Sequence, residues 1–146
     1  MKIAIDIHGT IDARTVFFSR LIKLLRAYGI EIHITTGVQS SIGLKEQLRK
    51  WEIEYDVLFS ITDYHLAKGT KVTWDENGDP WIEESIWDRT KADYCKRNNV
   101  DLAIDDSEVY ETYFDTPYIR FDRKKIKTNA EIEENNEVPF MKWMVP

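Results

Sequence analysis

The sequence predicts an α/β domain with a three-layer, Rossmann-like parallel sheet of about five strands. Short runs rich in β-branched residues alternate along the chain with segments whose apolar residues follow the helical period of about 3.6. Strands joined by a helix of this length pack in parallel with a right-handed crossover. An Asn77-Gly78 pair interrupts the alternation in the second half of the chain and predicts a small β-hairpin insertion.

The first predicted unit is a strand, a helix and a second strand. Residues 2–7 (K-I-A-I-D-I) are followed closely by Gly9, so they predict a buried strand that ends at a loop. Apolar residues in 15–28 recur at helical spacing, and Gly29 is well placed to end that helix. Residues 30–35 form the next predicted strand, which makes the intervening segment the crossover helix.

The second predicted unit continues the alternation and then departs from it. A helix is expected to open at Ser40 or Ser41 and to run to about Trp51, and a third strand is expected at 56–61. The segment 71–82 instead contains two short β-like arms around an Asn-Gly turn. We therefore expect a hairpin inserted on the parallel framework.

The last part of the predicted core alternates helix and strand again, at about 83–97, 100–104, 108–114 and 118–121. These elements predict one α/β domain at 1–122, with the hairpin insertion at about 70–82. The tail at 123–146 shows no regular period. Its apolar end is expected to pack on the domain or on a partner subunit, because exposed Phe, Met and Trp side chains are unfavourable.

Composition limits the class of protein. The length of 146 residues and the 42% hydrophobic content suit one globular core. The net charge of -6, with no large basic block, argues against general nucleic-acid binding. No apolar stretch is long enough to cross a membrane, no signal peptide is recognisable, and Cys95 is the sole cysteine, so we expect a cytoplasmic protein without a disulfide framework.

Polar residues gather at the predicted strand ends, where open parallel sheets bind their ligands. These residues, with one lysine from the helix before the fourth strand, are Asp6, His8, Thr35, Thr36, Gly37, Lys91, Asp105, Asp106 and Ser107. Carboxylates, hydroxyls and an ammonium at one edge suit phosphoryl transfer through a covalent intermediate. Mutual repulsion of the acids calls for a cation, and Mg²⁺ fits because it takes carboxylate ligands and shares a substrate phosphate.

These motifs, in this order, resemble those of the haloacid dehalogenase superfamily over about residues 2–122. The family's D-x-D-G-T is matched by D-I-H-G-T at Asp6 to Thr10, and its hydrophobic strand ending in Thr or Ser is matched by I-H-I-T-T-G. Its third motif is a Lys, and its paired acids after a strand are matched by D-L-A-I-D-D-S. Receiver domains use similar residues, but there the acidic pair follows the first strand, whereas here it comes last.

The resemblance implies a magnesium-dependent phosphohydrolase that cleaves phosphate monoesters through an aspartyl phosphate at Asp6. It implies phosphate contacts from Gly9, Thr10, Thr35, Thr36, Gly37 and Lys91, and Mg²⁺ ligands from Asp6, Asp105, Asp106 and the backbone carbonyl of His8. Thr35 is the alternative to Thr36 as the catalytic hydroxyl, because one residue decides which side chain faces the site. The alternatives to Lys91 are Lys68, Lys71 and Lys96.

His8 departs from the family pattern, in which this position holds the Asp that protonates the leaving oxygen and then activates water. Three explanations stay open. His8 acts as the acid and base of a phosphohydrolase, since imidazole can do this work; or the domain is noncatalytic and binds a phosphorylated ligand or protein partner. The third is a different reaction of the same superfamily, or an altered chain.

The hairpin is the remaining clue to the substrate. It brings Trp74 and Trp81, with Trp87 nearby, and these aromatic rings could stack on the base or sugar of a small nucleotide or sugar phosphate. The alternative is that they anchor the hairpin to the core or form a contact in a homo-oligomer. A large cap domain after the first motif is excluded, because only a helix fits there.

Overall fold

The computed structural model describes residues 1–122, and its centre is a parallel sheet of five strands in the order β3-β2-β1-β6-β7. The strands are β1 (Lys2–Asp6), β2 (Glu31–Thr36), β3 (Val57–Ser60), β6 (Leu102–Asp105) and β7 (Tyr118–Arg120). The predicted α/β class with a Rossmann-like parallel sheet is confirmed. From β1 the chain adds strands on one side and then returns to add two on the other, so strand order reverses at β1.

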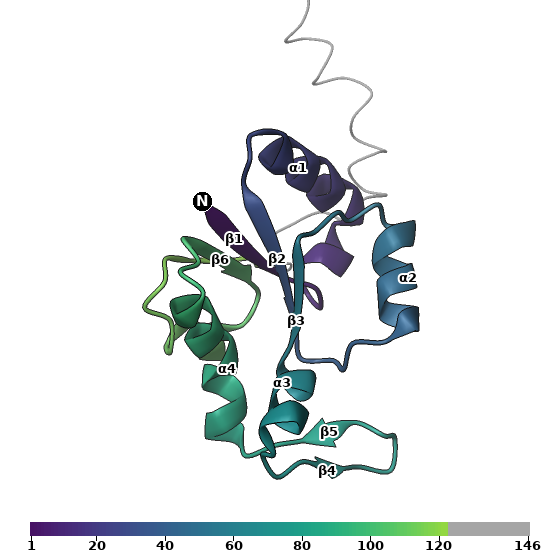
Figure 1. Ribbon diagram of the computed structural model, residues 1–146, viewed down its shortest axis with the longest axis vertical. Coiled ribbons are helices and arrows are strands. Elements are labelled where there is room, and N and C mark those ends of the chain that lie inside the picture. The colour runs from purple at the N-terminus through teal and green to yellow at the C-terminus, as the bar shows by residue number, and fades with distance from the viewer. Residues whose placement is uncertain (123–146) are drawn as a thin grey trace, which may run out of the picture.

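Helices cover both faces of the sheet (Figure 1). Their bounds are α1 (Thr15–Ala27), α2 (Ile42–Lys50), α3 (Ile61–Lys68), α4 (Glu84–Arg97) and α5 (Glu108–Glu111), with a 3₁₀ turn η1 at Ile11–Ala13. Successive side chains of β1 point to opposite faces of the sheet. Ile3 and Ile5 pack with α1 and α2 on one face, whereas Ala4 packs with α3 and α4 on the other. The three-layer arrangement therefore follows from a period of two in the strands.

Local signals explain most helix boundaries. Gly29 adopts a positive φ of 79° just past α1, as its position predicted, and Ser41 caps α2 by accepting a hydrogen bond from the Leu44 amide at 3.0 Å. The helix α3 was not predicted. It begins directly after β3, where Ser60 is both the last strand residue and the N-cap, and its buried Thr62 and His65 do not form an apolar stripe.

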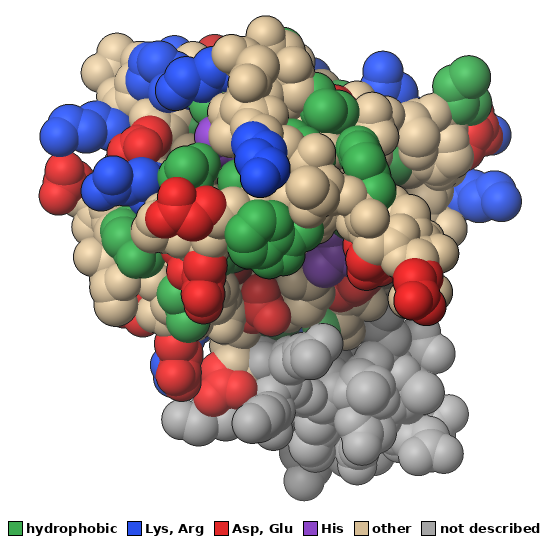
Figure 2. Space-filling view, turned by 90° about the horizontal axis from the view of Figure 1, so that it is seen from below, with side chains coloured by type: hydrophobic (Ala, Val, Ile, Leu, Met, Phe, Trp, Pro, Cys, Tyr) green, Lys and Arg blue, Asp and Glu red, His purple; other side chains and the backbone are tan. Residues whose placement is uncertain are grey.

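The hairpin is confirmed as a separate two-stranded antiparallel unit, β4 (Thr73–Trp74) and β5 (Pro80–Trp81). Asp75 closes its turn by accepting hydrogen bonds from the amides of Asn77 and Asp79, both at 2.8 Å. Seen from the hairpin side, acidic and hydrophobic side chains lie side by side on the molecular surface (Figure 2). Trp74 and Trp81 are 48% and 59% exposed, so neither is buried as an anchor.

Two further expectations concern membrane-spanning segments and the tail. No helix among residues 1–122 is long and apolar enough to cross a membrane. The expected packing of the tail at 123–146 lies outside the described residues.

Candidate functional site

Three carboxylates meet at the carboxyl edge of the sheet, where strand order reverses. Asp6 ends β1, Asp105 ends β6, and Asp106 follows it. A carboxylate oxygen from each lies within 4.8 Å of the others. Asp6 and Asp105 are only 4% and 3% exposed, so these charges face one another away from bulk water. The sequence prediction that these acids converge agrees with this geometry.

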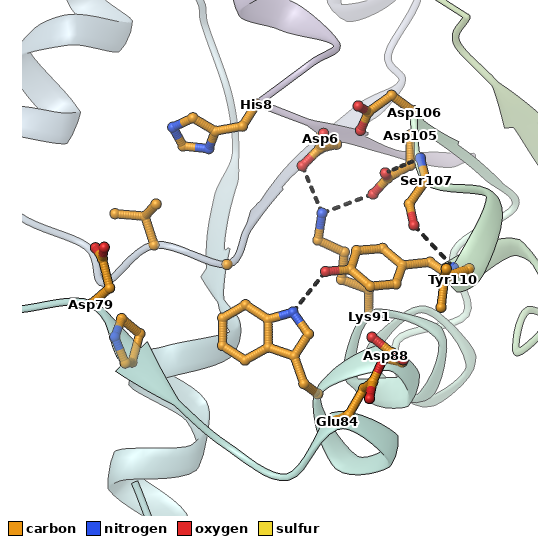
Figure 3. A pocket seen from close by; sticks show the side chains of 15 residues that line it. Asp6, His8, Asp79, Glu84, Asp88, Lys91, Asp105, Asp106, Ser107 and Tyr110 are labelled. Carbon is orange, nitrogen blue, oxygen red and sulfur yellow. Dashed lines mark hydrogen bonds and ion pairs between the residues drawn. The ribbon is translucent and has the colours of Figure 1, made fainter. Parts of the chain in front are cut away.

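Lys91 lies between two of these acids. Its Nζ atom donates to Asp6 Oδ1 at 2.6 Å and to Asp105 Oδ2 at 2.8 Å (Figure 3). The side chain comes from α4 and is 4% exposed. The alternative lysines lie elsewhere: Lys68 is over the Tyr64 ring, Lys96 pairs with Asp115, and Lys71 is exposed. Of the four lysines considered, only Lys91 contacts the acids.

The electrostatics of the group show an excess of negative charge. Burial raises the pKa of Asp6 to about 7, Lys91 opposes this, and the charges of Asp105 and Asp106 add to it. Burial and the neighbouring Asp105 also raise the pKa of Asp106. Burial alone would lower the pKa of Lys91, but Asp6 and Asp105 outweigh it and raise that pKa, so the ammonium stays charged. One ammonium therefore faces three acids.

This group is suited to a cation. Its donors are all carboxylate oxygens, the ligands that hard divalent ions prefer. A bound cation would also relieve the mutual repulsion that raises the pKa of Asp6 and of Asp106. The donor set fits a metal ion without specifying which ion it is.

The loop after β1 is shaped around Asp106. Gly9 has a φ of +87°, and a Cβ atom there would lie 2.1 Å from Asp106 Oδ2, so a side chain would displace the carboxylate. The Gly9 amide donates to Asp12 Oδ1 at 2.7 Å, which holds the loop. The buried Thr10 hydroxyl donates to Asp6 Oδ2 at 3.2 Å. In this structure Thr10 therefore orients Asp6.

His8 lies on the other side of Asp6 from Asp106, and its ring points away from the Asp6 carboxylate (Figure 3). The side chain is exposed, and its Nδ1 atom lies 3.4 Å from Thr36 Oγ1. Thr36 Oγ1 in turn accepts a hydrogen bond from the Val38 amide at 3.1 Å. Thr35, the alternative, is buried and paired in register with Asp6. Thr36 is thus the threonine whose hydroxyl contacts His8.

Ser107 and its neighbours hold Asp105 in place. The Ser107 amide donates to Asp105 Oδ1 at 3.0 Å, and the Ser107 hydroxyl caps α5 by accepting from the Tyr110 amide at 3.1 Å. Tyr118 donates its hydroxyl to the Ser107 carbonyl at 2.6 Å. The start of α5 is therefore tied to the acid group.

A cavity of about 520 Å³ opens above these residues. Asp6, His8, Gly37, Lys91, Asp105, Asp106 and Ser107, all expected at this edge, are among the residues that line it. The walls that the sequence did not predict include Asp79, Glu84, Asp88 and Tyr110. One signal was available, because residues 84, 87, 88 and 91 fall on one face of a helix once Lys91 is assigned.

The aromatic wall of the cavity is fixed on two sides. Trp87 Nε1 donates to the Tyr110 hydroxyl at 2.7 Å. A Cβ atom on Gly37 would lie 2.6 Å from the Trp87 ring, so the ring packs directly on the backbone after β2. Trp87, one of three tryptophans considered for substrate stacking, lines the cavity, and Trp74 and Trp81 do not.

The other histidines and the cysteine are structural. His33 contacts Tyr94 and Glu31, both at 2.6 Å, and His65 contacts Thr70 and Thr90, both at 2.8 Å. Both rings are buried, as is Cys95.

Together these residues provide a buried carboxylate open to a cavity, a neighbouring ammonium and a group of acids that could hold a metal ion. The assembly lies where α/β sheets bind ligands. Comparison with models of known protein families, with curated proteins and with solved structures finds no match for this chain.

Proposed function

We propose that the protein is a magnesium-dependent phosphohydrolase of the haloacid dehalogenase type, which cleaves phosphate monoesters through Asp6. One observation carries the proposal: Lys91 bridges Asp6 and Asp105 beside Asp106, at the floor of a cavity. The order of the sequence motifs supports it independently, because each motif contributes a residue to this one edge.

The reaction has two displacements at phosphorus. In the first, an Asp6 carboxylate oxygen attacks, the ester P–O bond breaks, and the leaving oxygen takes a proton from protonated His8. In the second, water attacks the aspartyl phosphate while neutral His8 accepts its proton, and the bond to Asp6 breaks. Inorganic phosphate leaves, and both Asp6 and His8 return to their starting forms.

The surrounding residues prepare Asp6 for this role. Lys91 offers its ammonium to the carboxylate and to the entering phosphoryl oxygens, which carry the charge of the transition state. Thr10 orients the second Asp6 oxygen, and Thr36, which is fully buried, contacts His8 through its hydroxyl. The floor of the cavity therefore combines a nucleophile with donors on two sides.

Asp6, Asp105 and Asp106, with the backbone carbonyl of His8, are the groups that would hold Mg²⁺. When bound, the ion supplies positive charge to the phosphoryl oxygens and lowers the repulsion between the phosphate and the acids. The acids are the reason that the site needs such an ion.

A second candidate is a noncatalytic domain that binds a phosphorylated ligand or protein partner. It is favoured by the His8 ring, which points away from Asp6 and must turn inward to exchange a proton with a leaving oxygen (Figure 3). This candidate keeps the role of Lys91 and the acids but omits turnover.

The test is phosphate release from a panel of monoesters, including p-nitrophenyl phosphate, with and without Mg²⁺. The native chain is compared with Asp6→Asn and His8→Asp, and Asp115→Asn is the control because its carboxylate pairs with Lys96 at the exposed end of α4. We expect magnesium-dependent release that Asp6→Asn abolishes. Activity in His8→Asp alone would favour the binding domain, and equal activity in native and Asp6→Asn proteins would refute the mechanism.

A further inference from the structure

The outer walls of the cavity carry acids that the phosphoryl chemistry does not use. Asp79 comes from the hairpin, and Glu84 and Asp88 come from the first turns of α4. Within residues 1–122, none of these three side chains forms an ion pair. Their charge therefore faces the cavity without a basic partner from the described chain.

The charge of the whole lining is strongly unbalanced. Among the residues that the structure describes, the lining has six acids, Asp6, Asp79, Glu84, Asp88, Asp105 and Asp106, and one lysine, Lys91. The proposed Mg²⁺ and Lys91 together offset the three acids on the floor. A substrate phosphate then enters with its own negative charge, and the three outer acids stay uncompensated.

Asp88 is held where its negative charge is unfavourable. Burial raises its pKa, and the nearby Glu84 raises it further. The helix dipole explains an acid at Glu84, in the first turn of α4, but it does not explain a second acid one turn later that faces the cavity. A carboxylate kept in this position suits a positively charged group brought by a ligand.

An aromatic surface lies beside these acids. The Trp87 ring is held between Gly37 and Tyr110, and the remaining wall is apolar, with Val38, Pro80 and Val109. Aromatic ring faces attract organic cations, and alkyl groups on the cation gain contact with the same surface. Figure 3 shows Glu84 and Asp88 on the same side of the cavity.

We propose that the substrate of this site is a phosphate monoester whose alcohol carries an alkylammonium group. The phosphate would occupy the floor at Asp6 and Lys91, and the ammonium would lie against Trp87, Glu84 and Asp88. This inference rests on the proposed function. A neutral nucleoside or sugar would leave the outer acids without a partner, and a second phosphate or a carboxylate would be repelled by them.

A matched pair of esters tests the role of charge. Phosphocholine and 3,3-dimethylbutyl phosphate have the same shape, but the quaternary nitrogen of the first is a neutral carbon in the second. We expect kcat/KM for phosphocholine to exceed that for the neutral ester by about tenfold. Calorimetry with both esters gives the same comparison for binding, without depending on turnover.

Variants locate the effect. Asp88→Asn and Glu84→Gln should each lower the ratio of kcat/KM for phosphocholine to kcat/KM for the neutral ester by about threefold. The double variant should bring this ratio close to unity. Asp93→Asn is the control, because Asp93 is an exposed acid of the same helix outside the cavity lining. The ratio in this control should match that of the native chain.

The outcomes separate this inference from the proposed function. Hydrolysis of both esters at equal rates, or a preference for adenosine monophosphate, would overturn the substrate class and leave the phosphohydrolase standing. No release from any ester, with calorimetric preference for phosphocholine, would support the ligand class and overturn hydrolysis. No preference in either measurement overturns the substrate class.

Discussion

The Nζ atom of Lys91 lies 2.6 Å from Oδ1 of Asp6, although 85 residues separate them in the chain. Both side chains are almost fully buried, at 4% and 6% exposure. A buried charge without its partner is costly, so this contact ties the position of α4 to the end of β1. The same contact opposes the effect of burial, which raises the pKa of the proposed nucleophile.

Replacing Lys91 should destabilise the fold strongly. Lys91→Met leaves three facing acids without a counter-charge, and we expect a loss of about 3–5 kcal/mol in the free energy of unfolding. Lys96→Met is the matched control, because Lys96 lies on the same helix but pairs with Asp115 at the exposed surface. The control variant should lose less than about 1 kcal/mol in the free energy of unfolding. Urea unfolding without metal measures both, and equal losses would contradict the buried-pair argument.

The raised pKa of Asp6 predicts a pH dependence. Its pKa is about 7 in the folded chain against an ordinary 3.8, so between these values the folded state binds more protons than the unfolded state. The free energy of unfolding contributed by this group therefore falls as pH rises through that window. Thermal unfolding of native and Asp6→Asn proteins across this pH range measures the change in the free energy of unfolding. The decrease with rising pH should be smaller in the variant.

Mg²⁺ should reverse that trend, because it binds ionised carboxylates. We expect a larger increase in Tm on adding Mg²⁺ at about pH 8 than at about pH 5.5. The increase should vanish in Asp105→Asn combined with Asp106→Asn. An equal increase in that double variant would place the metal elsewhere on the protein.

Gly37→Ala tests whether the aromatic wall is packed against the backbone. The added Cβ would lie 2.6 Å from the Trp87 ring, so the ring must move. We expect this to lower the free energy of unfolding by about 1–3 kcal/mol. In the control Gly43→Ala, the nearest described atom to the Cβ is Ser41 Oγ at 3.7 Å, and the higher helix propensity of Ala should stabilise α2 by about 0.5–1 kcal/mol. Chemical unfolding of the two variants should give changes of opposite sign.

The floor of the site could be predicted because the ends of strands can be recognised in the sequence. Asp6 and Asp105 follow short apolar runs, and parallel topology brings such ends together, so their meeting required no knowledge of side-chain packing. Lys91 was harder to choose among four lysines, because a helix position fixes its direction only when the helix is docked. The contact with Asp6 and Asp105 decided between them.

The walls of the cavity were not predictable in the same way. Trp87 was considered only for its proximity to the hairpin, whereas its place depends on the missing side chain at Gly37, which belongs to another element. The helix α3 was overlooked because one residue, Ser60, ends a strand and caps the helix. Features that depend on contacts between distant segments, or on residues with two roles, leave little periodic signal in the sequence.

Gly9→Ala should abolish metal binding. Gly9 has a φ of +87°, and its Cβ would lie 2.1 Å from Asp106 Oδ2, so the substitution must push that carboxylate out of the acid group. Gly29→Ala is the matched control, since Gly29 has a φ of +79° and a Cβ there meets no atom of residues 1–122 within 4 Å.

Both variants should lose about 1 kcal/mol of unfolding free energy from the left-handed backbone, with any further loss in Gly9→Ala coming from the clash. Only Gly9→Ala should lose Mg²⁺ affinity, which calorimetry measures directly, and it should lose the Tm increase on adding Mg²⁺ as well. Normal Mg²⁺ binding by Gly9→Ala would mean that Asp106 is not a ligand, because the substitution must displace that carboxylate.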